Sequence, residues 1–373
     1  MMPDPSHGNI APRSNLCRYR LLKCIFGESA ILYIVKGLVH CKLSPMRFTF
    51  SGLTRLFDFR QFSACVMVIV GVLFADVALA NETVSISYQR SSTLFILLKR
   101  TGELEKKLNA LGYDVSWHEF STGLLQSLNA GSVDLHADVA DAFALFTQAA
   151  NAPLTYYAEE TSAPTAQAII VPPDSPIRSI ADLKGKRVAV AKGSGCNFLL
   201  LAALAKAGLT INDIQVRYLE APDALAAFRG GNIDAWAIWD PFLAAEQRDA
   251  HVRVIADGTG GIAQYNRFYT ATTAFADKHP DVLRVVFDEL NATGKWVKAH
   301  PQEAAQILGP LWGNIPAPTV ELANSRRSYD IVPVKRDQLA EQQRIADTYH
   351  SAGLIPNVLN ATDIRIWTPP TAK

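Results

Sequence analysis

The sequence is poor in cysteine, and most of the cysteine it has lies near its start. Cys17, Cys24, Cys41 and Cys65 all precede residue 80, so Cys196 is the one thiol of the remaining 293 residues. A segment with one thiol forms no internal disulfide, and its core must therefore hold the fold unaided.

Common catalytic and metal-binding motifs are also missing. The histidines after residue 80 are scattered and form neither HExxH nor HxH, which argues against a metal site. They are His118, His136, His251, His279, His300 and His350. The sequence contains no GxSxG or GxGxxG, and the turn at Lys192 lacks the spacing of a nucleotide P-loop. We therefore expect no metal and no cofactor.

Basic charge is not in excess, although the formal net charge is +1. Nine of the 36 basic residues but only four of the 35 acidic ones lie in the first 80 positions, which leaves 27 basic and 31 acidic residues in the rest. No basic stripe is visible, so nothing indicates nucleic-acid binding. A hydrophobic content of 49% is ordinary for a globular protein.

An apolar run at 62–80 has the features of a signal peptide. Three arginines precede it, and Ala78 and Ala80 fit the small-residue positions of a cleavage site. We expect Met46 to be the start, cleavage to follow Ala80, and residues 1–45 to be an upstream extension. A retained membrane anchor is the alternative, but Asp76 interrupts the run, which is short for a span of about 20 apolar residues.

After residue 80 the pattern alternates between strands and helices. Period-two and apolar segments predict strands at 84–88, 114–120, 133–136, 166–171, 187–191, 216–219, 233–239 and 252–255. Helical spacing predicts helices at 93–111, 123–130, 140–150, 196–207, 224–229, from 241, and at 280–299, 301–311 and 337–352. Repeated βα units indicate an α/β fold with two lobes, each built on a mostly parallel sheet, followed by a helical tail.

Two small polar turns each lead from a strand into a helix. Gln89, Arg90 and Ser92 occupy the first turn, and Ser194 and Gly195 occupy the second. Helix N-termini carry unpaired N–H groups and favour anions, so the turns are candidates for an oxyanion site between the lobes. The alternative is that Ser92 and Ser194 are ordinary N-caps.

Other candidate residues also have two interpretations. Trp239 ends a strand and is either a wall of a cleft or part of the core, and Asp240 is either a ligand contact or a helix cap. Asp138 has the same two alternatives; with Asp141 it is only a weak acid–base pair. Cys196, at a helix start, is either a nucleophile or a small packing residue.

Stretches across nearly the whole mature chain resemble the periplasmic binding proteins of ABC importers for aliphatic sulfonates, including taurine. The stretches are 86–90, 104–112, 128–135, 146–154, 174–194, 237–244, 256–260, 326–331 and 341–356. The resemblance implies a two-lobed type II binding-protein fold with the ligand in the cleft between the lobes. It implies crossings near Val171 and Gly258, with 81–171 and 261–373 in lobe 1 and 172–260 in lobe 2.

The resemblance also implies site residues. The family's first loop falls on Gln89 and Arg90, its second turn on Gly193, Ser194, Gly195 and Cys196, and its Trp-Asp pair on Trp239 and Asp240. Tyr269 falls beside the cleft. Asp138 departs from the family's neutral segment; it would disfavour a purely anionic ligand and could receive the ammonium of a zwitterion such as taurine.

The leading hypothesis is therefore a monomeric, exported solute receptor and not an enzyme. It would hold a small aliphatic sulfonate through Arg90, Ser92 and Ser194, flank the tail with Trp239 and Tyr269, and deliver the ligand to a membrane permease. On this hypothesis Arg90→Ala weakens binding by about 1–3 kcal/mol. The alternatives are the same fold with another solute, such as nitrate, a pyrimidine precursor or a zwitterion, and a desulfinase that uses Cys196.

Overall fold

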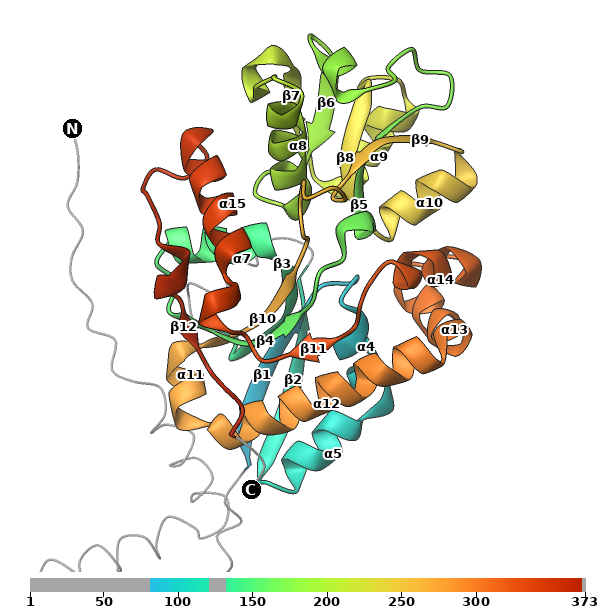
Figure 1. Ribbon diagram of the computed structural model, residues 1–373. Helices are drawn as coiled ribbons and strands as arrows, with labels where there is room; N and C mark the ends of the chain where they lie inside the picture. Colours follow the sequence, from blue (N-terminus) through green and yellow to red (C-terminus); the bar gives the residue numbers. More distant parts are fainter. Residues whose placement is uncertain (1–80, 121–131, 371–373) are drawn as a thin grey trace, which may run out of the picture. The chain divides into compact units, whose positions relative to one another are not determined.

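The computed structural model describes residues 81–120 and 132–370. Within them the chain forms two β-sheets, each covered by helices, as a two-lobed α/β fold requires (Figure 1). The proposed upstream extension, the signal peptide and the helix expected at 123–130 lie outside the described residues.

The first sheet has seven strands in the order β11-β4-β10-β3-β1-β2, with β12 beside β4. Its strands are β1 (Glu82–Tyr88), β2 (Tyr113–Glu119), β3 (Leu135–Ala140), β4 (Leu154–Glu160), β10 (Arg267–Thr272), β11 (Ile331–Val332) and β12 (Arg365–Ile366). β1 is parallel to β2 and β3, whereas β10 is antiparallel to both β3 and β4. The sequence pattern did not predict β4, β10, β11 or β12.

The second sheet has five strands in the order β7-β6-β8-β5-β9. They are β5 (Gln167–Val171), β6 (Arg187–Val190), β7 (Gln215–Tyr218), β8 (Ala235–Trp239) and β9 (Arg253–Asp257). β6 is parallel to β7 and β8, but β5 is antiparallel to β8 and β9. The expectation of mostly parallel sheets was therefore wrong, because β5 and β10, which follow the two crossings, enter their sheets antiparallel to both neighbours.

The chain crosses between the lobes twice, once between β4 and β5 and once between β9 and β10. β5 pairs with β8 and β9, so the first crossing lies between Glu160 and Gln167, and the expected boundary at Val171 was wrong. Residues 167–171 belong to the second sheet because their backbone hydrogen bonds are made there. The second crossing lies between Asp257 and Arg267.

Helices cover both sheets. In the first lobe and C-terminal region they are α4 (Thr93–Thr101), α5 (Glu103–Asn109), α7 (Asp141–Ala149), α11 (Thr273–Lys278), α12 (Pro280–Ala299), α13 (Pro301–Leu311), α14 (Ala317–Ser325) and α15 (Ala340–Ser351). In the second lobe they are α8 (Gly195–Lys206), α9 (Ala221–Arg229) and α10 (Phe242–Asp249). None of the helices in 81–120 and 132–370 is long and apolar enough to cross a membrane.

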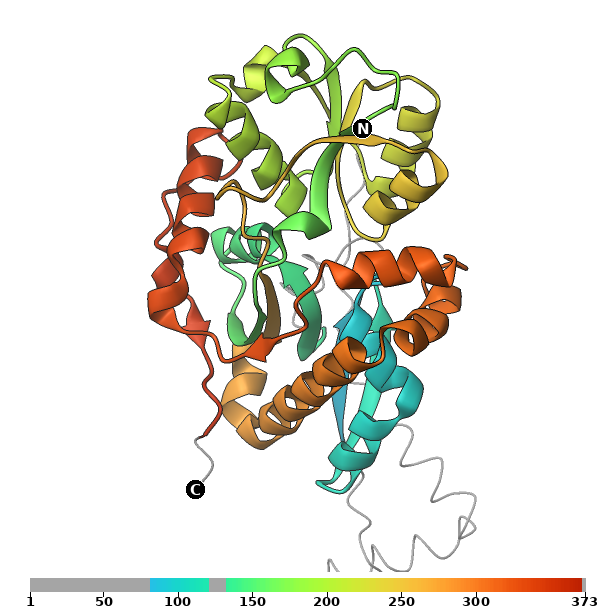
Figure 2. The same cartoon turned by 45° about the vertical axis from the view of Figure 1, so that its right-hand side comes forward.

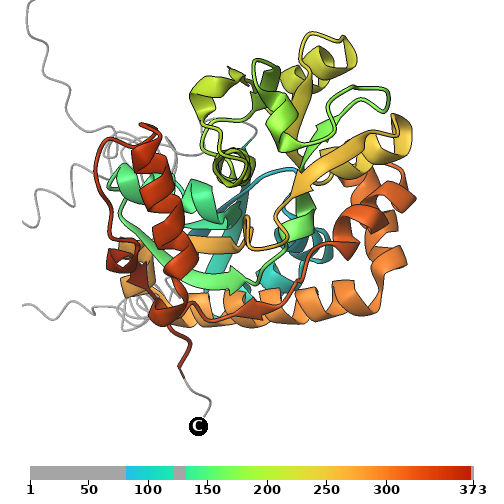
Figure 3. The same cartoon turned by 45° about the horizontal axis from the view of Figure 1, so that its top comes forward.

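The predicted tail helices at 280–299 and 301–311 match α12 and α13. α12 buries Val282, Val286 and Leu290 on one face, and it crosses the first lobe next to α4 and α5 (Figure 3). The single helix expected at 93–111 is two helices, because Gly102 adopts a left-handed conformation with φ of 72°. Glycine adopts this conformation at little cost, so the chain turns there.

The C-terminal helix α15 packs against α7 of the first lobe and α8 of the second (Figures 1 and 2). Ile345, Ala346 and Tyr349 share one apolar cluster with Leu145 of α7 and Leu199 of α8. α15 therefore joins the lobes on this side through buried apolar contacts.

Glu159 in β4 gives a pH-dependent test of the fold. Its side chain is buried, and burial raises its pKa from 4.5 to about 7. Between these values the folded protein retains a proton that the unfolded chain has lost, so stability falls as the pH rises. We predict that Glu159→Gln increases the free energy of unfolding at pH 8 by about 1–3 kcal/mol and has little effect near pH 4. Urea denaturation at both pH values tests this, and an equal effect at both would contradict it.

Candidate ligand-binding site

A small cavity lies between the lobes. Its volume is about 10 Å³, roughly the room for one water molecule. The second lobe contributes Asp240, the first crossing contributes Ala166, and the second crossing contributes Tyr265. The first-lobe residues are Ser91, Arg267, Trp312, Ala323, Asn324 and Arg327. Because both lobes line so small a volume, the structure has the lobes closed on each other.

Four buried charged residues form a cluster at the cavity, where Arg267 and Arg327 line the wall and Asp138 and Glu160 pair with them. Arg267 donates to Asp138 from Nε at 2.5 Å, and Arg327 donates to the same carboxylate from Nη2 at 3.0 Å. Arg327 also pairs with Glu160, with Nε 2.9 Å from Oε1. Burial opposes ionisation of Asp138, but the two guanidinium groups outweigh it and hold its pKa below the usual value. The cluster is therefore balanced, with two acids and two arginines.

Two residues that line the cavity carry a neutral donor without a partner. Trp312 Nε1 and Asn324 Nδ2 are buried and have no hydrogen-bond partner in the part of the chain that the structure describes. Asn324 Oδ1 accepts a hydrogen bond from Tyr329 Oη at 2.6 Å, which leaves the amide nitrogen as the free end. Buried donors rarely remain unpaired, so this wall suits a ligand that accepts hydrogen bonds.

The first predicted loop contributes less than expected. Ser92 is buried, and its hydroxyl accepts from Gln89 N at 3.1 Å. Arg90 is 65% exposed and pairs with Glu119 at 3.3 Å. None of these three residues lines the cavity, whereas their neighbour Ser91 does. No side chain caps α4, so its first N–H groups, next to Ser91, lack a side-chain acceptor.

The second predicted turn leads into α8, and Tyr265 of the second crossing lies against it. Ser194 is the N-cap of α8, where its hydroxyl accepts from Asn197 N at 3.2 Å, as the cap interpretation expected. A Cβ on Gly195 would overlap the ring of Tyr265. Cys196 is fully buried, and burial raises the pKa of its thiol. Its side chain belongs to the apolar cluster that α8 shares with α7 and α15, as the packing alternative expected.

Trp239 and Asp240 lie where the lobes meet. Trp239 is half-buried and packs near Tyr265 and Ala166, while Trp236 is the core residue of this strand. Asp240 lines the cavity and also accepts from Ala244 N at 3.0 Å, so it both caps α10 and faces the site. Burial raises the pKa of Asp240 to about 7, although nearby Arg326 favours its ionised form.

Two predicted roles do not fit the structure. Asp138 does not line the cavity, and Arg267 and Arg327 already pair with its Oδ2, so the structure does not favour its expected role as an ammonium receptor. Tyr269 is fully buried in the first-lobe core against Phe95 and does not line the cavity, so the structure does not favour its expected role as a flank of the ligand tail. Its side chain, on β10, packs in the hydrophobic core that covers the first sheet.

Sequence reasoning missed most of the cavity wall. Tyr265, Arg267, Trp312, Asn324 and Arg327 were not assigned to the site. Two features of the sequence could have pointed to these arginines. Arg267 is a basic residue at the start of a strand that the pattern did not predict, and Arg327 belongs to an Arg-Arg pair that follows a helix. Trp312 and Asn324 gave no local signal, since they reach the cavity only through the packing of the tail helices. Among the described residues no group of three or more metal-ligating side chains is arranged to hold a metal ion.

Comparison with known proteins gives the family. Residues 118–304 match the family model described as NMT1/THI5 like. The chain is 38% identical over 291 residues to an Escherichia coli sequence named as an aliphatic sulfonates-binding protein, covering 77% of this chain and 89% of that one. The chain belongs to the NMT1/THI5-like family, together with the aliphatic sulfonates-binding proteins.

Solved structures agree with this assignment and with the expected fold. The crystal structure of the periplasmic aliphatic sulphonate binding protein of Escherichia coli matches with 37% identity and a TM-score of 0.71, covering 78% of this chain and 94% of that one. The alkanesulfonate-binding protein of Xanthomonas axonopodis pv. citri, solved bound to MOPS, matches with 33% identity and a TM-score of 0.71, covering 78% and 99%. A desulfurization enzyme shares the fold alone, at 14% identity and a TM-score of 0.57 over 76% and 95%.

The contact between Gly195 and Tyr265 predicts coupling between the α8 N-terminus and the cavity wall. We predict that Gly195→Ala destabilises the protein by about 1–3 kcal/mol, because the new Cβ displaces the Tyr265 ring. Denaturation of Gly195→Ala, Tyr265→Ala and the double variant measures this as a cycle. The glycine substitution should cost much less once the ring is removed, and an undiminished cost would refute the contact.

Proposed function

We propose that this protein is the exported solute-binding component of an ABC importer and that it holds the head group of a small aliphatic sulfonate in the interlobe cavity. The observation that carries the proposal is the pair of unpartnered donors, Trp312 Nε1 and Asn324 Nδ2, in a buried cavity. A sulfonate is a permanent anion whose three oxygens accept hydrogen bonds without needing a proton.

The charged residues around the cavity are consistent with a ligand that carries a single, permanent negative charge. Arg267 and Arg327 are balanced by Asp138 and Glu160, and Arg326 is balanced by Asp240. The ligand would therefore be stabilised by neutral donors, by the guanidinium edges that line the cavity, and by the start of α4 near Ser91. The cavity is smaller than any alkanesulfonate, so the lobes must separate slightly to hold one.

The choice between an alkanesulfonate and a zwitterion such as taurine follows from the carboxylates. Asp240, the one carboxylate among the described lining residues, already pairs with Arg326, and Asp138 behind the wall already pairs with two arginines. We therefore expect ethanesulfonate to bind more tightly than taurine in isothermal titration calorimetry. The relatives are named for sulfonates, which favours a sulfonate over nitrate or a pyrimidine precursor; these two solutes serve as competitors in the same assay.

The enzyme alternative lacks support from this site. A desulfinase based on Cys196 requires a thiolate that reaches the ligand, whereas this thiol is fully buried, has a raised pKa and does not line the cavity. By analogy with its periplasmic relatives, we propose that the protein works in the periplasm as a monomer after cleavage of its signal peptide. The closed form would present both lobes to a membrane permease.

Replacing Trp312 tests the site directly. Trp312→Phe keeps an aromatic ring but removes the Nε1–H donor, so we predict a loss of about 1–3 kcal/mol in the binding of ethanesulfonate. Trp296→Phe is the matched control, because Trp296 stacks on His300 away from the cavity. Calorimetry gives both affinities.

The Arg90→Ala variant distinguishes a head-group site at the first loop, which the sequence predicted, from the proposed site at the interlobe cavity. The structure predicts less than about a threefold effect on affinity, because Arg90 is exposed and paired with Glu119. A large loss for Arg90→Ala with no loss for Trp312→Phe would move the head group to the first loop and refute the proposed cavity site.

A further inference from the structure

A buried ion pair joins the two lobes at the edge of the cavity. Arg326, which follows α14 in the first lobe, donates from Nη1 to both oxygens of Asp240 in the second lobe, at 2.9 and 3.0 Å. Its Nη2 donates to Gln247 of α10. The two charged side chains are only 14% and 5% exposed. The pair is therefore better ordered and less hydrated than an ordinary surface ion pair.

The helices that carry this pair lie side by side. α10 of the second lobe packs against α14 of the first, and both views show the two helices meeting across the lobes (Figures 1 and 2). Asp240 also caps α10 through Ala244 N at 3.0 Å, so the carboxylate that receives Arg326 is fixed to that helix. An opening wide enough to move α10 away from α14 must break the contact between Arg326 and Asp240, whereas a slight widening of the cavity need not.

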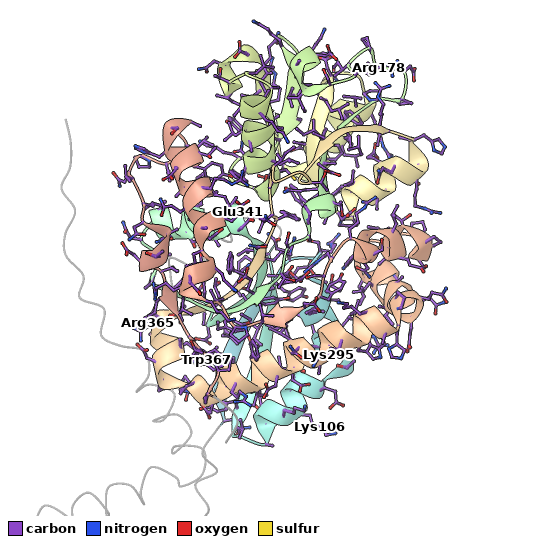
Figure 4. All side chains as sticks on the ribbon, in the orientation of Figure 1. Lys106, Arg178, Lys295, Glu341, Arg365 and Trp367 are labelled. Carbon is purple, nitrogen blue, oxygen red and sulfur yellow. The ribbon has the colours of Figure 1, made fainter. Side chains whose placement is uncertain are left out.

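The opposite side of the interface has a different chemistry. There α15 joins α7 and α8 through a buried apolar cluster, and Tyr349 Oη donates to Ser194 O at 3.0 Å. Glu341 of α15, labelled in Figure 4, accepts from Gln264 N of the second crossing at 3.0 Å. Exposing an apolar cluster to water is unfavourable, whereas separated charges regain hydration. The α15 side is therefore suited to stay closed, and the α10–α14 side is suited to open.

We propose that the Arg326–Asp240 pair is a latch that forms when the lobes close and slows the release of the bound ligand. Arg326 does not line the cavity, so it acts on the ligand through the position of the lobes and is a positioning residue. Its neighbour Arg327 cannot replace it, because Arg327 is held within the first lobe by Glu160 and Asp138. The effect on ligand release rests on the proposed function, whereas the effect of the pair on lobe closure does not.

Kinetics with ethanesulfonate test the latch. Arg326→Gln should increase the dissociation rate constant about tenfold and leave the association rate constant within about twofold, as is usual when a buried contact of the bound state is lost. Arg284→Gln is the matched control, since Arg284 forms a surface pair with Asp288 on α12. Asp240→Asn keeps an oxygen for the α10 cap but removes the charge. Because both variants remove the same ion pair, the double variant should increase the dissociation rate constant no more than Arg326→Gln does alone.

Small-angle X-ray scattering of the ligand-free proteins gives a second, independent readout. The radius of gyration of Arg326→Gln should exceed those of the wild type and Arg284→Gln, with unchanged circular dichroism. An unchanged radius together with unchanged dissociation would overturn the latch. If the wild type binds no sulfonate, the proposed function fails, but scattering still tests whether the pair holds the lobes together.

Discussion

The structure depends on the pairing of buried charges where three strands of the first sheet end. Asp138 of β3 and Glu160 of β4 are both buried, and neither would be tolerated there without a cationic partner. Arg267 comes from the strand between them, and Arg327 comes from the segment after α14. The pairing therefore draws segments distant in sequence to one point and sets two guanidinium groups in the cavity wall.

The buried ion pairs around the cavity are of two kinds, those within the first lobe and the one that crosses between the lobes. Within the first lobe the arginines are committed to their acids, so the wall of the cavity is fixed before any ligand arrives. Across the lobes, Arg326 and Asp240 form a pair that separates when the lobes part. A preformed wall with a breakable latch suits a receptor that must capture a solute and later release it.

The sequence predicted the fold class and most helices, because apolar periodicity is a local property; the exact limits of α12 and α13 are examples. It missed β4, whose sequence LTYYAEE is buried throughout and ends in two glutamates, of which Glu160 pairs with the distant Arg327. The site was predicted less well for the same reason. The resemblance named Asp240, which lines the cavity, but not Trp312, which reaches the wall through long-range packing.

The central claim is that the cavity between the lobes receives the sulfonate group on neutral donors beside a balanced charge cluster. A crystal structure of the protein with ethanesulfonate tests it most directly. The account predicts sulfonate oxygens within about 3 Å of Trp312 Nε1 and Asn324 Nδ2, with Arg267 and Arg327 still paired to Asp138. A sulfonate bound outside this cavity, or one that displaces Asp138 from both arginines, would contradict it.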